Sequence, residues 1–200
     1  MIDLLVRILC FLILVLIMPL LLLLGLIIKI SYPGKIFYRQ PREGKHGRVF
    51  RIWKLRTMRA NADRILADLL KNDEQKAREM QDFGCLRDDP RIAGSVAKLA
   101  RQLSIDELPQ LINIVTGDMT LVGPRPLELF LAESLDAKSR AIRNAVKPGL
   151  TGLWQVGPRS DINIRQMQFY DKLYIKKKSL QLDMYIICKT AQVVIKRTGM

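Results

Sequence analysis

Residues 103–126 read L-S-I-D-E-L-P-Q-L-I-N-I-V-T-G-D-M-T-L-V-G-P-R-P, and the rest of the chain is organised around this stretch. Two adjacent carboxylates, Asp106 and Glu107, stand at a proline-interrupted helix start. The stretch closes on the turn Gly123-Pro124-Arg125-Pro126. Because proline fixes its own φ and restricts the residue before it, this turn holds Arg125 in few orientations. A pair of acids beside a fixed guanidinium indicates a site for phosphate chemistry.

The same residues also have a purely structural interpretation. Ser104-x-x-Glu107 matches a capping box, in which Glu107 reaches back to the N-cap amide. Asp106 would then be a first-turn acid favoured by the helix dipole. The two interpretations are compatible, because a helix N-terminus also keeps a carboxylate ionised and therefore nucleophilic.

The charge of the chain is strongly basic and lies outside its N-terminus. Lys and Arg total 33 against 19 acidic residues, which gives a net charge of +14. The first 28 residues hold only Asp3 and Arg7, so the whole excess lies on residues 29–200. A domain with this charge is expected to bind anionic partners, which are nucleic acid, anionic lipid headgroups or phosphorylated substrates. The length suits one domain with a real core, or a small domain plus an anchor.

Cysteine and histidine offer little chemistry. Cys10, Cys85 and Cys188 are too scattered for a disulfide framework or a zinc site, and they suggest a reducing compartment. The single histidine, His46, lies in a Lys/Gly-rich turn. We therefore expect carboxylates to act as the general bases.

The N-terminus is predicted to be a membrane anchor over residues 1–28, followed by a basic catalytic domain over residues 29–200. Residues 8–28 carry no charge and match the ~20 residues that cross a hydrocarbon core. A signal peptide is disfavoured, because its apolar run is ~7–15 residues long and no small-x-small cleavage site precedes the charged region. Pro19 kinks the segment near its middle. A kinked single span and a re-entrant hairpin bending at Pro19 both fit.

The fold class is predicted to be mainly α with a small β-hairpin (α+β). The β-rich segments 36–38 and 49–53 flank the turn-forming residues 41–47, and most of the basic residues there are expected to be solvated or lipid-facing. The final helix is amphipathic and basic, and it either lies in the membrane interface or packs on the protein core. Helices are predicted over residues 61–83, 95–103 (capped by Ser95), 126–145, 161–174 (capped by Asp161) and 180–195.

Six motifs in order resemble the bacterial sugar transferases, the monotopic polyprenyl-phosphate phosphoglycosyl transferases. Any one motif alone is weak evidence, but six in sequence are highly specific. They are Phe37-x-Arg39-Gln40-x-Arg42-x-Gly44, Lys54-x-Arg56-Thr57-Met58, Asp89-Pro90-Arg91-Ile92, Ser104-Ile105-Asp106-Glu107-Leu108-Pro109-Gln110, Gly123-Pro124-Arg125-Pro126 and Lys147-Pro148-Gly149-Leu150-Thr151-Gly152-Leu153-Trp154-Gln155-Val156.

The resemblance implies an enzyme on the cytoplasmic face of the bacterial inner membrane. It would transfer a sugar phosphate from a UDP-sugar to undecaprenyl phosphate and release UMP, as the first membrane step of glycoconjugate assembly. The family uses the Asp of its Asp-Glu pair as a nucleophile that needs Mg²⁺, which carries over to Asp106, with Glu107 as its acidic partner. The chain looks like the small form of the family, with one re-entrant helix. Met18 stands where some members have Ser, and Ala93 stands where Thr is common.

The physical chemistry agrees with this reaction. An aspartate nucleophile splits the transfer into two steps and predicts ping-pong kinetics. Attack on a diphosphate needs charge neutralisation by Mg²⁺ and by cationic side chains. Family resemblance and charge together nominate Lys54, Arg101, Arg125 and Arg159 for phosphate contacts.

The main alternative is a non-enzymatic, membrane-tethered basic module that binds anionic lipid or nucleic acid. It offers no reason for Asp106-Glu107 inside a basic surface, nor for the Gly-Pro-Arg-Pro turn. We therefore expect membrane lipids, a UDP-sugar and undecaprenyl phosphate as partners, with no nucleic acid. A homo-oligomer is compatible with the sequence.

Overall fold

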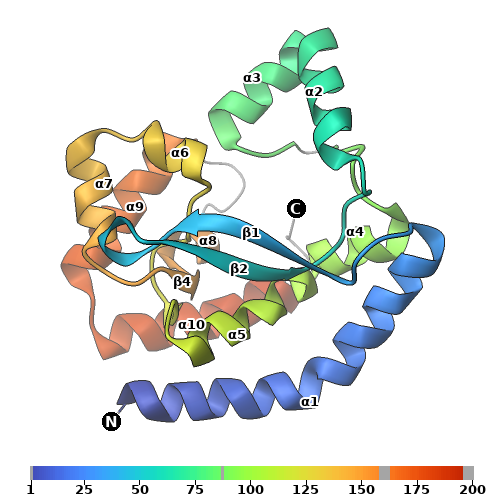
Figure 1. Ribbon diagram of the computed structural model, residues 1–200. Coiled ribbons are helices and arrows are strands. Elements are labelled where there is room, and N and C mark those ends of the chain that lie inside the picture. Colours follow the sequence, from blue (N-terminus) through green and yellow to red (C-terminus); the bar gives the residue numbers. More distant parts are fainter. Residues whose placement is uncertain (1, 87, 158–162, 196–200) are drawn as a thin grey trace.

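The fold is mainly helical with two small sheets, and the predicted α+β class is confirmed at this level. The computed structural model describes residues 2–86, 88–157 and 163–195. Figure 1 shows a long N-terminal helix along one side of the body, with a twisted two-stranded ribbon across the middle.

The ribbon is the predicted β-hairpin. Strands β1 (Phe37–Glu43) and β2 (Val49–Leu55) pair antiparallel, with Gln40 opposite Ile52, and the short helix η1 (Lys45–Gly47) connects them. β1 continues through Pro41, which was predicted to lie in the turn. A two-stranded sheet has only edge strands, where a proline without an N–H is tolerated.

A second sheet was not predicted. β3 (Thr120–Val122) and β4 (Gly149–Thr151) form a short parallel pair. The turn Gly123-Pro124-Arg125-Pro126 directly follows β3. The chains approach so closely that a Cβ on Gly149 would lie 2.1 Å from the Gly123 nitrogen. Only glycine allows that approach, so Gly149 fixes where β4 meets the turn.

Two predicted helices are each divided in the structure. Residues 61–83 form α2 (Ala62–Asn72) and α3 (Glu74–Phe83), because extended Asp73 ends the first and its carboxylate caps the second. Residues 126–145 form α6 (Leu129–Glu133) and α7 (Ala137–Asn144), where Asp136 caps α7. In both cases an aspartate that accepts backbone N–H bonds restarts the helix.

Two predicted caps also differ. The helix α4 (Gly94–Gln102) begins at Gly94 after Ala93, so Ser95 lies inside it. Asp161 lies outside the described residues, and α9 (Ile164–Lys177) instead has an Asn163–Gln166 capping box.

The N-terminal helix α1 (Ile2–Ser31) contains Pro19 and is bent near its middle (Figure 1). It is the one helix of the described chain that is long and apolar enough to cross a membrane, with a mean hydropathy of 3.3 over its most apolar window. Most of its leucines and isoleucines are exposed, whereas Cys10, Leu14, Leu21 and Ile28 are buried.

Both halves of α1 pack on the same body. Before Pro19, Cys10 and Leu14 join a core that includes Phe50 and Ile114, the latter on α5 (Leu111–Thr116). After Pro19, Ile28 joins a second core with Leu55 of β2 and the alanines of α4. The apolar helix therefore completes two cores and leaves its other face exposed.

The last helix, α10 (Leu180–Ile195), has the predicted bounds, and both proposed roles have support. Ile186 is fully buried against Val122 and Tyr174, and the Tyr174 hydroxyl donates to Asp183 at 2.8 Å. Leu180, Met184, Tyr185 and Ile195 remain exposed.

Candidate active site

The two adjacent carboxylates lie on η2 (Ile105–Gln110), a short 3-10 helix between α4 and α5. Ser104 precedes it in the left-handed region, at φ 55° and ψ 22°, and makes no capping hydrogen bond to the helix with its side chain. The predicted capping box is therefore wrong. Glu107 donates its backbone N–H to the Ser104 carbonyl at 3.2 Å, but its carboxylate is directed elsewhere.

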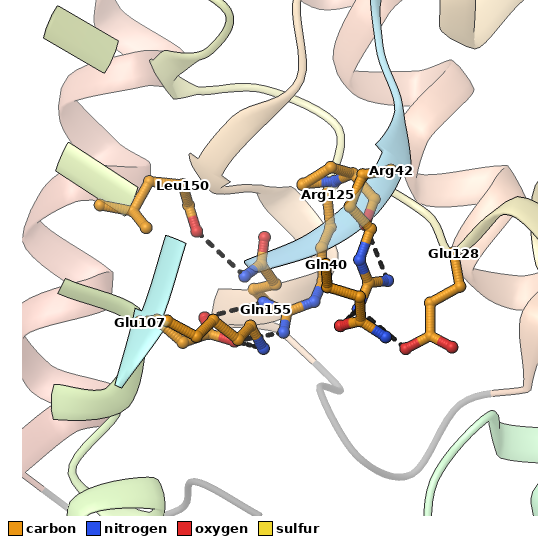
Figure 2. A network of polar contacts seen from close by, with 9 residues as sticks. Gln40, Arg42, Glu107, Arg125, Glu128, Leu150 and Gln155 are labelled. Atoms are coloured by element: carbon orange, nitrogen blue, oxygen red, sulfur yellow. Dashed lines mark hydrogen bonds and ion pairs between the residues drawn. The ribbon is translucent and has the colours of Figure 1, made fainter. Parts of the chain in front are cut away.

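Glu107 is held between two cations from other parts of the chain (Figure 2). Lys54 of β2 donates to Glu107 Oε1 at 3.1 Å. Arg125 donates through both terminal nitrogens, one to Oε2 at 2.9 Å and the other to Oε1. This fork-to-fork pairing fixes the Glu107 carboxylate and the guanidinium together. The side chains of Lys54 and Glu107 are each only 17% exposed.

The three groups change one another's protonation. Burial alone would raise the pKa of Glu107, but the charges and hydrogen bonds of Arg125 and Lys54 outweigh it and hold that pKa well below its usual value. Burial lowers the pKa of Lys54, opposed by the Glu107 charge. Burial also opposes the charged form of Arg125, yet Glu107 raises the pKa of its guanidinium overall. Glu107 is therefore ionised and fully engaged.

Asp106 differs from Glu107 in its contacts and in its pKa. It is only 5% exposed, and its carboxylate makes no hydrogen bond or ion pair with any residue that the structure describes. Burial raises its pKa to about 6, partly opposed by the charge of Lys54, while the adjacent Glu107 charge raises it further. Arg101 and Arg125 also lower it. The predicted helix-dipole effect on Asp106 is thus smaller than the effect of burial, as expected for so short a helix.

The Gly123-Pro124-Arg125-Pro126 turn is held by backbone contacts on both sides. The Gly123 N–H donates to Thr151 at 2.9 Å, and the Gly149 N–H donates to the Pro124 carbonyl at 2.8 Å. Arg143 of α7 donates to the Arg125 carbonyl at 2.5 Å and forms an ion pair with Asp171 of α9. The second sheet therefore positions Arg125 against Glu107.

Arg42 is a site residue that the sequence named only as part of a motif. Its guanidinium donates to Gln40 at 2.6 Å, to Glu128 at 2.8 Å and to the Pro126 carbonyl at 3.3 Å (Figure 2). These bonds connect β1 to the segment at Pro126 and Glu128 that follows Arg125. The spacing Phe37-x-Arg39-Gln40-x-Arg42 contains the signal, but it does not say that Glu128 is the partner.

Asn113 on α5 was missed entirely, although it joins α5, which directly follows η2, to β2. Its side-chain oxygen accepts the Trp53 N–H at 3.0 Å, and its amide donates to the Arg51 carbonyl at 2.9 Å. These bonds replace a strand neighbour on the outer edge of β2. They place Lys54, the next residue, within reach of Glu107.

Arg101 and Arg159 are the remaining residues predicted to contact phosphate, and the structure describes only the first of them. Arg101 lies near the end of α4, and its charge acts on Asp106. Its buried Nε atom has no hydrogen-bond acceptor in the described chain, which leaves that guanidinium able to take an anion. Arg159 lies outside the described residues. The structure thus brings together Lys54, Arg101, Asp106, Glu107 and Arg125.

The carboxylates of this site suit a metal ion whose other ligands come mainly from the substrate. The described residues contain no group of three or more His, Cys, Asp or Glu side chains placed to hold a metal ion. Asp106 is the one member of the acid pair without a cationic partner in the described structure. Mg²⁺ commonly binds through one or two carboxylates, waters and substrate phosphates, so this site fits a phosphate-bound Mg²⁺ and not an all-protein cage.

The chain matches the family described as bacterial sugar transferase over residues 1–197. It therefore belongs to the bacterial sugar transferase family, and it is an enzyme of the phosphoglycosyl transferase class. Both expectations from the sequence motifs are confirmed.

Two relatives illustrate the range of the family. The exopolysaccharide production protein ExoY of Sinorhizobium fredii is 39% identical over 90% of this chain and 79% of its own length. The undecaprenyl-phosphate galactose phosphotransferase of Salmonella typhimurium is also 39% identical, over 83% of this chain but only 34% of its own length.

A third relative is named for a different sugar. The UDP-N-acetylgalactosamine-undecaprenyl-phosphate N-acetylgalactosaminephosphotransferase of Aeromonas hydrophila is 34% identical over 90% of this chain and 40% of its own length. The chain therefore spans most of some relatives and about a third of others.

Proposed function

We propose that the protein transfers a phosphosugar from a UDP-sugar to undecaprenyl phosphate through a covalent intermediate on Asp106. Relatives named for undecaprenyl-phosphate galactose and N-acetylgalactosamine transfer support the substrate classes. The observation that carries the mechanism is the unequal pairing of the two carboxylates. Glu107 is bound by Arg125 and Lys54, whereas Asp106 is buried with no partner in the described chain.

The first step forms a bond between an Asp106 carboxylate oxygen and the sugar-bearing β-phosphorus. The bond from that phosphorus to the bridging oxygen breaks, and UMP leaves with the electron pair. In the second step an oxygen of undecaprenyl phosphate attacks the same phosphorus, and the bond to Asp106 breaks. The carboxylate is regenerated, and the product is undecaprenyl diphosphate sugar. This sequence is covalent catalysis with ping-pong kinetics.

The protein's own groups prepare both steps. With a pKa of about 6, Asp106 is mostly ionised near pH 7 and remains a better nucleophile than an acid of low pKa. Arg125 and Lys54, fixed on Glu107, and Arg101 supply positive charge where phosphoryl oxygens gather. Mg²⁺, bound by Asp106 and substrate phosphates, would supply further neutralisation of the diphosphate.

The decisive experiment measures UMP release by the purified full chain with undecaprenyl phosphate and Mg²⁺. The donors are UDP-galactose, UDP-N-acetylgalactosamine, UDP-N-acetylglucosamine, UDP-glucose and an N-acetylated bacillosamine-type UDP-sugar. We expect release with one donor, its loss in EDTA, and its loss in Asp106→Asn but not in Asp68→Asn, a substitution on the exposed face of α2. An intact-mass increase equal to one phosphosugar, absent in Asp106→Asn, would identify the intermediate. Salt-sensitive anion binding without turnover of any donor would favour the basic binding module.

The anchor is proposed to be re-entrant, with both ends on the cytoplasmic side of the inner membrane. Cys10 and Leu14 before Pro19, and Ile28 after it, pack on one body, which a straight crossing would separate. The test is a single cysteine at position 3 in a chain in which Cys10, Cys85 and Cys188 are all replaced by serine. Labelling by an impermeant reagent only after the cytoplasmic face is opened supports the hairpin. Labelling from the periplasm refutes it.

A further inference from the structure

A second cationic site lies away from the acid pair, between the N-terminal half of α1 and the body. It is a groove of about 240 Å³. Its apolar floor includes Val6, Ile114, Met119 and Val146. Its charged groups are Asp3, Arg7, Lys45, Lys147 and Lys178. Neither Asp106 nor Glu107 lines this groove, so it is separate from the acid pair.

Four separate segments supply the cations. Arg7 comes from α1, Lys45 from η1, Lys147 from the connection before β4, and Lys178 from the end of α9. None of these four has a hydrogen bond or ion pair from its side chain to any residue that the structure describes. Asp3 is the one acid of the lining. The groove thus carries an excess of positive charge that nothing in the described chain neutralises.

The guanidinium of Arg7 lies beside the end of α5. Gly117 ends α5 with φ 89°, and a Cβ there would lie 2.6 Å from Arg7 Nη2. The guanidinium therefore lies directly against Gly117, whose positive φ favours glycine at this position. The Thr120 N–H donates to the Pro148 carbonyl at 2.8 Å and so fixes the Lys147–Pro148 segment beside the same end of α5.

The surroundings indicate where an anion would come from. On its outer face this half of α1 exposes Leu4, Leu5, Ile8, Leu9 and Leu12. A helix with such a face lies in acyl chains, so the groove opens at the depth of the lipid headgroups. Positive side chains at this depth attract anionic lipids, and an apolar floor accepts the upper part of an acyl chain.

We propose that this groove binds the phosphate headgroup of an anionic phospholipid, with Arg7, Lys45 and Lys147 on the phosphate. A bound lipid would neutralise the groove and hold the N-terminal half of α1 against α5 and η1. This is a structural lipid site, distinct from the polyprenyl phosphate substrate at Asp106. It does not depend on the proposed reaction.

The test is titration of the full chain in detergent with dioctanoyl-phosphatidylglycerol, followed by native mass spectrometry. The comparison lipid is dioctanoyl-phosphatidylcholine, and inorganic phosphate serves as the free-anion competitor. We expect one saturable phosphatidylglycerol molecule, weaker binding of phosphatidylcholine, and no displacement by equimolar inorganic phosphate. Equal binding of the two lipids, or displacement by free phosphate, would overturn the lipid assignment.

Variants locate the site. Lys45→Gln combined with Lys147→Gln is expected to weaken phosphatidylglycerol binding about 25-fold, since each lysine near a headgroup contributes about five-fold. Arg7→Gln tests the same site from a different element. Lys71→Gln on exposed α2 makes the same change of charge per lysine and is expected to leave affinity unchanged. Wild-type affinity in both groove variants, with unchanged circular dichroism, would refute the proposal.

Discussion

Asp106 and Glu107 are adjacent on η2, yet the fold gives them opposite surroundings. Two cations from β2 and from the Arg125 turn enclose Glu107 and hold its pKa low. Asp106 is buried with no hydrogen-bond or ion-pair partner in the described chain, and its pKa is raised to about 6. The charge of Glu107 is therefore balanced by two cations, whereas the charge of buried Asp106 has no direct partner in the described chain. Adjacent carboxylates of one motif need not share a role.

The largest expected effect is on turnover. Asp106→Asn removes the proposed nucleophile with little change of side-chain volume, so we expect UMP release to fall by at least about 10³-fold. Initial rates with the preferred donor measure it, with Asp68→Asn as the matched control. A loss below ten-fold would mean that the contrast between the two carboxylates has no catalytic consequence.

Glu107→Gln is expected to have its main effect on stability. It leaves Lys54 and Arg125 close together without their shared counter-charge. Breaking a buried pair in this way costs about 3–5 kcal/mol, and partial exposure of Arg125 favours the lower figure. Thermal unfolding in detergent should show a melting temperature roughly 6–12 °C lower. Glu133→Gln on exposed α6 controls for the loss of one surface acid, and equal melting of both variants would contradict the role of Glu107.

Asp106→Asn is expected to change stability in the opposite direction. The folded pKa of about 6 lies above the ordinary value of 3.8, so the folded state holds the proton more tightly. Stability from this group is present below pH 4 and is lost as pH rises through 6. The substitution should therefore stabilise the protein at pH 7–8, by at most about 3 kcal/mol, with no gain at pH 4. Melting curves across this range decide it, and destabilisation at pH 8 would show that Asp106 has a stabilising partner.

The smallest expected effect is on the pH profile. The ionised form of Asp106 is the proposed nucleophile, so kcat/KM should rise with pH and level off above an inflection near 6. Glu107 contributes to the raised pKa of Asp106, so Glu107→Gln should move the inflection down by about one unit. The profile is measured at a temperature where the variant is folded. An unchanged inflection would mean that burial alone sets the pKa of Asp106.

The sequence predicted local features well. The hairpin from Phe37 to Leu55 and the helix from Leu180 to Ile195 depend on residue patterns that lie within each segment. Family resemblance and charge likewise nominated Lys54, Arg101, Arg125 and Arg159 for a site around Asp106 and Glu107, and all of these except Arg159, which lies outside the described residues, lie close together. Pro19 and the run of leucines identified α1 as the apolar helix.

The missed features depend on contacts between distant residues. β3 and β4 are each three residues long and pair across an intervening helical region, so neither has a recognisable strand pattern alone. Ser104 and Glu107 have the spacing of a capping box, but the gain from Arg125 and Lys54 is larger than that from a backbone amide. The unpaired state of Asp106 follows from which cations reach η2, and that is a property of the assembled fold.

The contacts of α1 have a consequence for how the chain is made. The helix precedes its partners Ile114 and Ala97 in the chain and is therefore synthesised before them. The body thus completes its two interiors on a helix that is already made. A version trimmed of residues 1–28 would lack Cys10, Leu14, Leu21 and Ile28, which are interior side chains and not a removable tether. Folding of the body is thus coupled to the placement of α1.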